Sequence, residues 1–310
     1  MQMDSAGNVA FANGITTTGA AVIGNGLQVG TTFIPPYALY LKNRLINGTF
    51  LVSQRAITGT NNITVGTAGP TYNTGYTTVD RWFTLATTTG TAPSSAQTTG
   101  VNGVKQLTIT GAVGTTAVYV GQRIISANSY DLAGQTVTLS FYTSNSLLTS
   151  VSYQLAYATT NADNFGTLAV PTKTTISPSS PATGSVTVTG TLTRYTVSFV
   201  VPAAASTGLE VLFSVGAQTS GTWVLQDVQL EIGPNATPIE RRPFPQELAL
   251  CQAYYEKSFP VTQPVAQNAG RQGAFTFPFT QTGAVASGYV FQRPFVVAKR
   301  TFPASFQFTS

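Results

Sequence analysis

Apolar and polar side chains alternate along most of the chain between Asn43 and Gly233. This period of two is typical of β-strands that bury one face and expose the other to water. The apolar positions of the five clearest runs are Val137, Leu139 and Phe141; Val151, Tyr153, Leu155 and Tyr157; Tyr195, Val197, Phe199 and Val201; Leu209, Val211, Phe213 and Val215; and Val224, Val228, Leu230 and Ile232. Turn sequences separate these runs, and many short strands at regular spacing are typical of a sandwich or jelly roll. We therefore expect a mainly β fold, with an antiparallel jelly-roll β-sandwich over residues 37–233.

One helix is predicted after the last of these strands. Prolines hold residues 234–245 extended, and a single stripe of apolar residues then recurs at helical spacing: Leu248, Cys251 and Tyr255. Glu247 stands in the expected first turn and Lys257 in the last, as the helix dipole favours. We expect one α-helix near 246–257, within a linker and helix segment of residues 234–258. Because three turns are marginal in isolation, this helix needs a docking surface.

The two ends of the chain carry strand-like sequences that are too short to bury a core of their own. Residues 1–36 contain two copies of a glycine turn followed by a short apolar strand, at Gly7–Phe11 and Gly24–Val29. We expect this segment to be a neck or anchor. Residues 259–310 are aromatic-rich and predict a small C-terminal β region. Because symmetric copies can complete each other's cores, these features predict a homotrimer.

Four segments of the sequence resemble the receptor-binding tail proteins of bacteriophages. They are Asn43–Gly48, Asp80-Arg81-Trp82, Val228–Gly233 and Glu240–Ser258. The run that ends in Tyr254-Tyr255-Glu256 is the most specific part. The resemblance covers about residues 43–258. It implies a trimeric fibre of the virion tail, with a jelly-roll domain similar to carbohydrate-binding modules. The partners it implies are other phage tail or virion proteins and a glycan of the host surface.

The charge of the chain does not favour nucleic acid as a partner. Charged residues make up only 8% of the chain, against about 25% in ordinary soluble proteins. The net charge of +5 is spread out, and the only adjacent basic pairs are Arg241-Arg242 and Lys299-Arg300. The sequence shows no signal-peptide pattern at its start and no apolar run of about 18 residues. We therefore expect synthesis in the host cytoplasm without a signal peptide, and no membrane insertion.

The chain contains no histidine. This removes the Ser-His-Asp and Cys-His forms of catalysis, histidine-bound zinc and the usual general base at neutral pH. A pair of carboxylates, as in glycosidases, remains available. Three acids in the sandwich region have no evident structural role in the sequence: Asp163, Glu210 and Asp227. We predict that the protein is not an enzyme and has no catalytic residues, with a polysaccharide-degrading tailspike as the lesser alternative.

We predict no cofactor and no metal site. A calcium ion near a loop carboxylate such as Asp163 would fit the resemblance, but the acids do not show EF-hand spacing. The single cysteine, Cys251, cannot form a disulfide within the chain. We expect it to pack as a small hydrophobic residue.

Two aromatic residues are out of phase with the apolar runs beside them. Tyr142 follows Phe141, and Trp223 precedes Val224. Sugars present C–H faces that stack on aromatic rings, so side chains that point away from the core are candidates for binding. We predict Tyr142 and Trp223 as carbohydrate-binding residues, with packing between subunits as the alternative for each.

These observations predict a phage virion tail fibre protein that recognises and attaches to the host surface, through a polysaccharide. A purely structural neck, collar or head-fibre protein of the virion is the alternative.

Overall fold

The computed structural model describes residues 2–3, 9–10, 27–29, 32–34, 42–55, 61–65, 75–265 and 295–300. The chain divides into two compact units, Met1–Tyr40 and Leu41–Ser310. In the first unit, two strand pairs are formed by β1 (Gln2–Met3) with β2 (Val9–Ala10), and by β3 (Leu27–Val29) with β4 (Thr32–Ile34). The rest of the predicted neck lies outside the described residues.

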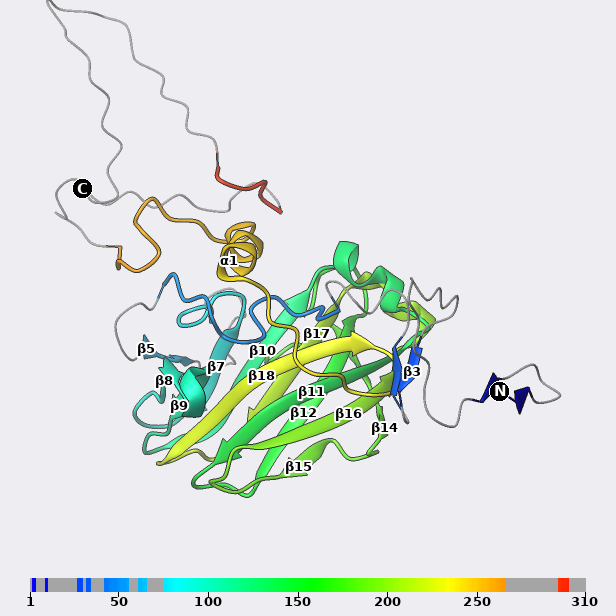
Figure 1. Cartoon of the computed structure of the whole chain (residues 1–310). Coiled ribbons are helices and arrows are strands. Elements are labelled where there is room, and N and C mark those ends of the chain that lie inside the picture. Colours follow the sequence, from blue (N-terminus) through cyan, green and yellow to red (C-terminus); the bar gives the residue numbers. More distant parts are fainter. Residues whose placement is uncertain are drawn as a thin grey trace, which may run out of the picture. The chain divides into compact units, whose positions relative to one another are not determined.

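The second unit is built on two sheets of seven strands each (Figure 1). The first, here called the β10 sheet, has the order β13-β12-β17-β10-β7-β6, with β15 also paired to β12. Its pairs are antiparallel except for β6 and β7, which are parallel. Its strands are β6 (Thr64–Val65), β7 (Phe83–Thr88), β10 (Thr115–Ile124), β12 (Ser150–Ala158), β13 (Lys173–Ile176), β15 (Ser185–Thr187) and β17 (Leu209–Val215).

The second sheet, here called the β11 sheet, has the order β14-β16-β11-β18-β9-β8-β5. Its strands are β5 (Asn61–Asn62), β8 (Ser94–Thr99), β9 (Lys105–Thr110), β11 (Thr136–Asn145), β14 (Pro178–Ser180), β16 (Thr193–Val200) and β18 (Thr222–Ile232). Short 3-10 turns connect some of the strands: η2 (Val101–Gly103), η3 (Ser126–Asn128), η4 (Tyr130–Leu132) and η5 (Ala203–Thr207).

The inner faces of the two sheets enclose one apolar core. The rings of Phe141 on β11 and Phe213 on β17 lie 4.8 Å apart across the two sheets, and Tyr153 on β12 packs edge-on against Phe199 on β16. Burial of each such side chain contributes about 1.5–3 kcal/mol. The prediction of an antiparallel jelly-roll sandwich is confirmed.

A β-bulge interrupts β18. Its register with β11 shifts between Ser140 and Tyr142, and Asp227 has a φ of +50°. A bulge inserts one residue into a strand, so it reverses the face to which the preceding side chains point. Leu225 and Val228 are accordingly both in the core. In a regular strand, residues three positions apart would point to opposite faces of the sheet.

The α-helix α1 (Phe244–Gln252) docks on the segment 42–55 (Figure 1). The residues it buries are Glu247 and Cys251, one helical turn apart, whereas Leu248 of the predicted stripe is only half-buried. The prediction that Leu248 faces the docking surface was wrong. That surface presents the backbone N–H of Asn47, and the Glu247 carboxylate accepts a hydrogen bond from it.

The helix begins earlier and ends earlier than the predicted range 246–257. The backbone N–H groups of Tyr254 and Tyr255 both donate to the Cys251 carbonyl, which turns the chain away from the helix axis. Lys257, predicted in the last helical turn, lies beyond the helix, and its Nζ donates to the backbone carbonyl of Gln54 at 2.8 Å. The two tyrosines therefore leave the helix and face the sandwich.

Asn47 connects three of the segments on which the phage resemblance was based. Its Nδ2 donates to the backbone carbonyls of Val52 (2.8 Å) and Asp80 (2.9 Å). Its own carbonyl accepts the indole N–H of Trp82 at 2.9 Å, and its backbone N–H donates to the Glu247 carboxylate. Asn47 is fully buried with a φ of +57°, a conformation that asparagine tolerates better than most residues.

Asn43 and Gly48 attach the same segment to β18. Asn43 Nδ2 donates to the Val228 carbonyl at 3.0 Å, and its Oδ1 accepts the Leu230 N–H at 3.1 Å. A Cβ atom at Gly48 would lie 2.2 Å from the Val228 carbonyl oxygen, so the close approach requires glycine. The motifs of the resemblance thus fix the segment 42–55 and α1 to the sandwich.

The predicted C-terminal β region, 259–310, falls mostly outside the described residues. Residues 259–265 and 295–300 are described and contain no strand. The second of these segments is attached near the end of α1, where Lys299 forms an ion pair with Glu256 and donates to the Gln252 carbonyl at 2.6 Å. Within the described ranges, no helix has the length and apolar character needed to cross a membrane.

Candidate functional site: an arginine–tyrosine pocket

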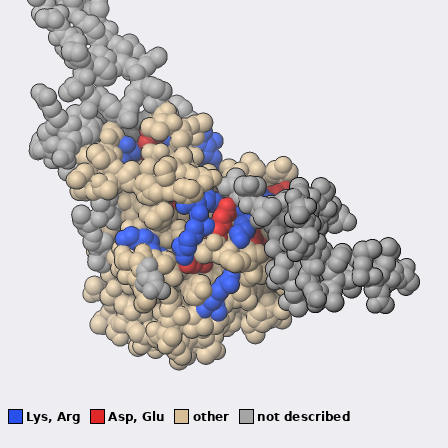
Figure 2. Space-filling model, viewed as in Figure 1, with Lys and Arg blue, Asp and Glu red and all other residues tan. Residues whose placement is uncertain are grey.

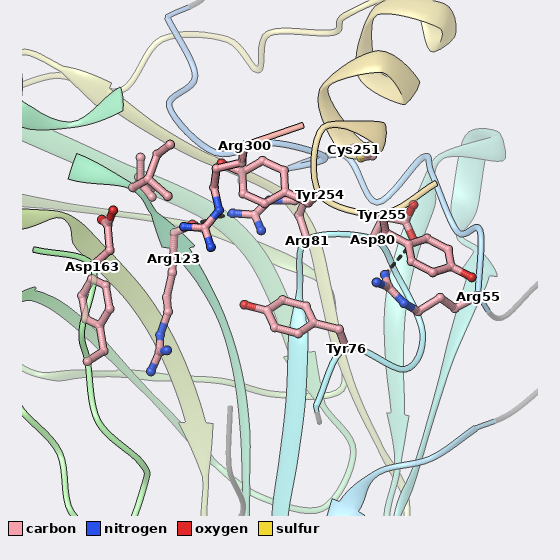
Figure 3. A pocket seen from close by; sticks show the side chains of 13 residues that line it. Arg55, Tyr76, Asp80, Arg81, Arg123, Asp163, Cys251, Tyr254, Tyr255 and Arg300 are labelled. Atoms are coloured by element: carbon pink, nitrogen blue, oxygen red, sulfur yellow. Dashed lines mark hydrogen bonds and ion pairs between the residues drawn. The ribbon is translucent and has the colours of Figure 1, made fainter. Parts of the chain in front are cut away.

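A pocket of about 250 Å³ lies where the turn after α1, the turn before β7 and the end of β10 come together (Figure 3). Its charged lining consists of Arg55, Asp80, Arg81, Arg123, Asp163 and Arg300. Its aromatic lining consists of Tyr76, Phe165, Tyr254 and Tyr255. We call this site the arginine–tyrosine pocket.

The Asp80-Arg81-Trp82 turn sends its three side chains to different places. Trp82 is fully buried in the core. The Asp80 carboxylate is bound by Gln54 and Arg55, whereas the Arg81 side chain lines the pocket beside Tyr254. Arg81 has a φ of +73°, a strained conformation that costs a non-glycine residue about 1–3 kcal/mol. Such strain persists only where the surroundings hold it, and it is often found in binding sites.

Arg81 is held against the turn that follows α1. Its guanidinium carbon lies 3.5 Å from the centroid of the Tyr254 ring, and its Nη2 donates to the Arg123 carbonyl at 2.6 Å. The guanidinium of Arg300 lies near the same ring, 5.6 Å from its centroid. Only 8% of Arg81 is exposed. Two cations therefore share one tyrosine ring at the pocket wall.

On the other side of the pocket, the charges of Asp80 and Arg55 are paired with each other. Asp80 accepts hydrogen bonds from Gln54 Nε2 (2.5 Å) and the Gln54 backbone N–H (3.2 Å), and it lies 3.6 Å from Arg55 Nη1. The Arg55 guanidinium stacks 3.6 Å from the centroid of the Tyr255 ring. Burial raises the pKa of the Asp80 carboxyl in spite of the Arg55 charge, and it also raises the pKa of Tyr255.

Arg123 links the pocket to the outer face of the β10 sheet. Its Nε donates to Glu210 Oε2 at 2.8 Å, and Glu210 also forms an ion pair with Lys173. Glu210 is completely buried beneath these two cations. The guanidinium of Arg123 lies 4.7 Å from the centroid of Phe165.

An aromatic surface continues from the pocket over that outer face. The Phe83 ring lies over Gly121, where a Cβ atom would come within 2.3 Å of Phe83 Cζ. Tyr76 meets Phe83 edge-on at 6.0 Å between centroids, and Tyr119 packs against the same cluster. Tyr76 and Tyr119 remain partly exposed. The site therefore offers tyrosine rings beside guanidinium donors, which is a combination suited to the C–H faces and the oxygen atoms of a saccharide.

Of the two residues predicted to bind carbohydrate, Tyr142 lies on the outer face of the β11 sheet, as expected. It is half-buried and stands opposite Arg194 of β16 and Gln226 of β18. The segment 234–243 lies along this face, where Glu240 N–H donates to Gln229 Oε1 at 2.7 Å. Figure 2 shows charged side chains in several groups across the upper and middle part of the visible face, with uncharged residues over its lower part.

The expectation that Trp223 points away from the core was wrong. Trp223 is fully buried in the core, and its indole N–H donates to Thr143 Oγ1 at 3.0 Å. The prediction assumed one phase from Val224 to Ile232, and the bulge at Asp227 reverses that phase. A buried indole cannot present its face to a sugar, and the structure places Tyr142 and Trp223 on opposite faces of the same sheet.

The three acids without an evident role in the sequence all have partners in the structure. Glu210 pairs with Arg123 and Lys173, as described above. Asp227 pairs with Arg241 at 2.7 Å, and Asp163 Oδ1 accepts the backbone N–H of Ser126 at 2.6 Å. Among the described residues, no three His, Cys, Asp or Glu side chains gather as a metal ion would require, and the Asp163 carboxylate is occupied by Ser126.

Sequence reasoning missed the pocket because its residues come from segments that are far apart in the chain. Arg81, Tyr254 and Tyr255 stood within the quoted motifs, so the resemblance did contain part of the site. No spacing in the sequence indicates that residues 54–55, 80–81, 123–125 and 254–255 come together in the fold. Cys251, in contrast, is buried as predicted, and burial raises the pKa of its thiol.

No protein-family profile and no curated protein matches the sequence. Among solved structures, a CBM4 carbohydrate-binding module is 18% identical with a TM-score of 0.36, over 60% of this chain and 98% of that one. The enzymatically active domain of tailspike protein 4 from bacteriophage CBA120 is 16% identical with a TM-score of 0.34, over 62% of this chain but only 22% of that one. The CBM22-1 xylan-binding domain from Paenibacillus barcinonensis is 11% identical with a TM-score of 0.32, over 54% and 93%. At such low scores and identities, these likenesses do not transfer a function to this chain.

Proposed function

We propose that this protein binds a saccharide without cleaving it, and that the arginine–tyrosine pocket is its binding site. The observation that carries the proposal is the arrangement of Tyr76, Tyr254 and Tyr255 around one pocket that also contains guanidinium donors. Aromatic faces stack on the C–H faces of sugar rings, and fixed polar groups then select their orientation. The phage resemblance and the pocket support the same class of ligand.

We further propose that the protein works in the virion tail, as a homotrimeric fibre that attaches to a host-surface glycan. The resemblance in residues 43–258 supports this assignment, together with the low content of charged residues, 8% of the chain. A surface of small and uncharged side chains suits close packing between identical chains. In solution, light scattering should give a mass near three times 32.5 kDa.

A polysaccharide-degrading activity is a second candidate, because Asp80 and Asp163 line the same pocket and burial raises the pKa of Asp80. Glycosidases use two carboxyl groups that flank the scissile bond. In Figure 3, however, these two residues lie at opposite ends of the pocket, with Arg81 and Tyr254 between them. Both carboxylates also accept hydrogen bonds from protein groups, which favours a structural role for each.

The proposal is tested with the full chain on an array of bacterial surface saccharides, followed by an assay for new reducing ends. We expect binding without release of reducing ends. If reducing ends appear and either Asp80→Asn or Asp163→Asn abolishes them, the protein is an enzyme. If no saccharide binds and the protein co-purifies with the virion, the purely structural alternative replaces the proposal.

A further inference from the structure

The buried cations of this chain follow a pattern that Arg81 breaks. The other largely buried cationic side chains in the described ranges each lie within ion-pair distance of a carboxylate: Arg123 and Lys173 with Glu210, Arg242 with Glu240 and Glu247, and Lys299 with Glu256. Arg81 is as deeply placed, with 8% exposed, yet no described carboxylate lies within that distance. Its Nε also has no hydrogen-bond partner among the described residues.

A buried charge without a counter-charge is destabilising, because the interior replaces water poorly. Arg81 adds to this cost its strained backbone, with a φ of +73°. Arg81 is not needed as the counter-ion of its neighbour Asp80, because Asp80 already binds Gln54 and Arg55. The same turn directs the Trp82 side chain into the core and the Arg81 guanidinium into the pocket beside Tyr254.

Arg300 provides a second cation at the same place. Its backbone N–H donates to the Ala253 carbonyl at 3.1 Å, which holds its segment against the turn after α1. Its guanidinium lies 5.6 Å from the centroid of the Tyr254 ring. Within the described part of the chain, Arg300 has no carboxylate partner either.

The charges of the lining do not cancel. The pocket contains four arginines and two aspartates. Arg55 is matched by Asp80, and Arg123 is matched by Glu210 outside the lining. Asp163 is turned to the Ser126 N–H and hydroxyl groups. The Asp163 carboxylate keeps its negative charge, but in the described part of the chain it lies within ion-pair distance of neither Arg81 nor Arg300, so both guanidinium groups can pair with an anionic ligand.

We infer that the pocket binds the carboxylate or phosphate group of an acidic saccharide residue. The planar guanidinium group donates two parallel hydrogen bonds to such oxygens, and these charge-assisted bonds are stronger than neutral ones. Arg81 covers one face of the Tyr254 ring at 3.5 Å, so the C–H face of the same sugar residue would stack on the opposite face of the ring. This inference rests on the proposed function and specifies the chemistry of its ligand.

The test compares charged saccharides with neutral forms of the same skeleton. The full chain is applied to an array of oligogalacturonates, oligomannuronates, sialyl oligosaccharides and phosphorylated glycans, each beside its methyl-esterified or dephosphorylated counterpart. We expect binding to acidic forms and loss of binding to the neutral counterparts. Binding confined to the uronate and sialyl ligands identifies the group as a carboxylate, and binding confined to the phosphorylated ligands identifies it as a phosphate.

Variants locate the effect within the protein. Arg300→Gln and Arg81→Gln should each weaken binding of the best acidic ligand by about tenfold or more, as expected for the loss of a hydrogen bond to a charged group. Lys105→Gln removes the same charge from β9, where Lys105 binds only the Thr99 hydroxyl among described residues, and it should bind as the wild type does. Because Arg300 is exposed, its variant should fold even if the Arg81 variant does not.

The results separate the inference from the proposed function. Equal binding of charged and neutral forms, unchanged in Arg300→Gln, would overturn the inference and leave saccharide binding intact. Failure of the wild-type chain to bind any saccharide on the array would overturn both.

Discussion

The guanidinium of Arg81 lies 3.5 Å from the centroid of the Tyr254 ring, and this contact joins the strained turn before β7 to the turn after α1. The two residues are distant in sequence, and each belongs to a motif whose other members have structural roles. Trp82 fills the core beside Arg81, and Glu247 anchors the helix that leads to Tyr254. The network that docks α1 therefore also builds one wall of the pocket.

This docking depends on close contact at Gly48. A Cβ atom there would lie 2.2 Å from the Val228 carbonyl oxygen, which is backbone and cannot turn aside. We expect Gly48→Ala to lower the free energy of unfolding by about 3 kcal/mol or more, within the range of severe steric substitutions. Urea denaturation measures this change. The matched control is Gly184→Ala, whose Cβ meets nothing within 4 Å; a similar loss in both variants would contradict the steric account.

Trp223 and Tyr142 should respond to substitution in opposite ways. Trp223→Ala removes a fully buried side chain and should lower the free energy of unfolding by about 3–5 kcal/mol. Tyr142→Ala alters a half-buried residue on the outer face of the β11 sheet and should cost about 1 kcal/mol or less. Thermal denaturation of the two variants provides the comparison. A small effect at Trp223 would restore the original prediction that its ring faces outward.

The Cys251 thiol should react slowly while α1 is docked. Burial raises its pKa, and the nearby Asp80 and Glu247 carboxylates add to this effect. In the native protein at about pH 8, alkylation by iodoacetamide should be about 100-fold slower than in urea, because the thiolate is the reactive form. Tyr255→Ala should speed the reaction by loosening the turn after the helix. Native and unfolded protein reacting at the same rate would show that the helix is not docked as described.

Asp80 should make stability depend on pH in the direction opposite to an ordinary surface aspartate. Burial raises the pKa of this carboxyl, so the folded protein holds the proton more tightly than the unfolded chain does. Its contribution to the free energy of unfolding therefore grows as the pH falls from the raised pKa toward about 4, and is lost as the pH rises through the raised pKa.

The control for this prediction is Asp80→Asn, which cannot titrate. Urea denaturation at about pH 7 and about pH 4 should show the wild type gaining stability relative to the variant as the pH falls. If the wild type instead loses stability relative to the variant on acidification, the Arg55 ion pair has a larger effect on the pKa of Asp80 than burial does.

The alternation of side chains was enough to predict the sandwich, because the period of two in runs such as Val151–Tyr157 reflects burial of one sheet face directly. It was not enough at β18. There, Trp223 and Leu225 face the core before the bulge, and Val228 faces it afterwards. The consecutive polar pair Gln226-Asp227 was the available signal, and a constant phase was assumed across it.

The pocket could be predicted only in part. The motif residues Arg81, Tyr254 and Tyr255 stood out in the sequence, but their meeting depends on how α1 docks. That docking is set by the hydrogen bond from the Asn47 N–H to Glu247, two residues that lie 200 positions apart in the chain. Long-range pairing of this kind leaves no periodicity in the sequence, so neither the pocket nor the unmatched charge of Arg81 could be derived from it.

A crystal structure of the full chain with a bound oligosaccharide from the array tests the central claim most directly. We predict a sugar ring against Tyr254, with an oxygen of its acidic group within hydrogen-bond distance of the Arg81 guanidinium. A saccharide bound instead beside Tyr142 on the outer face of the β11 sheet, with the arginine–tyrosine pocket empty, would contradict the account.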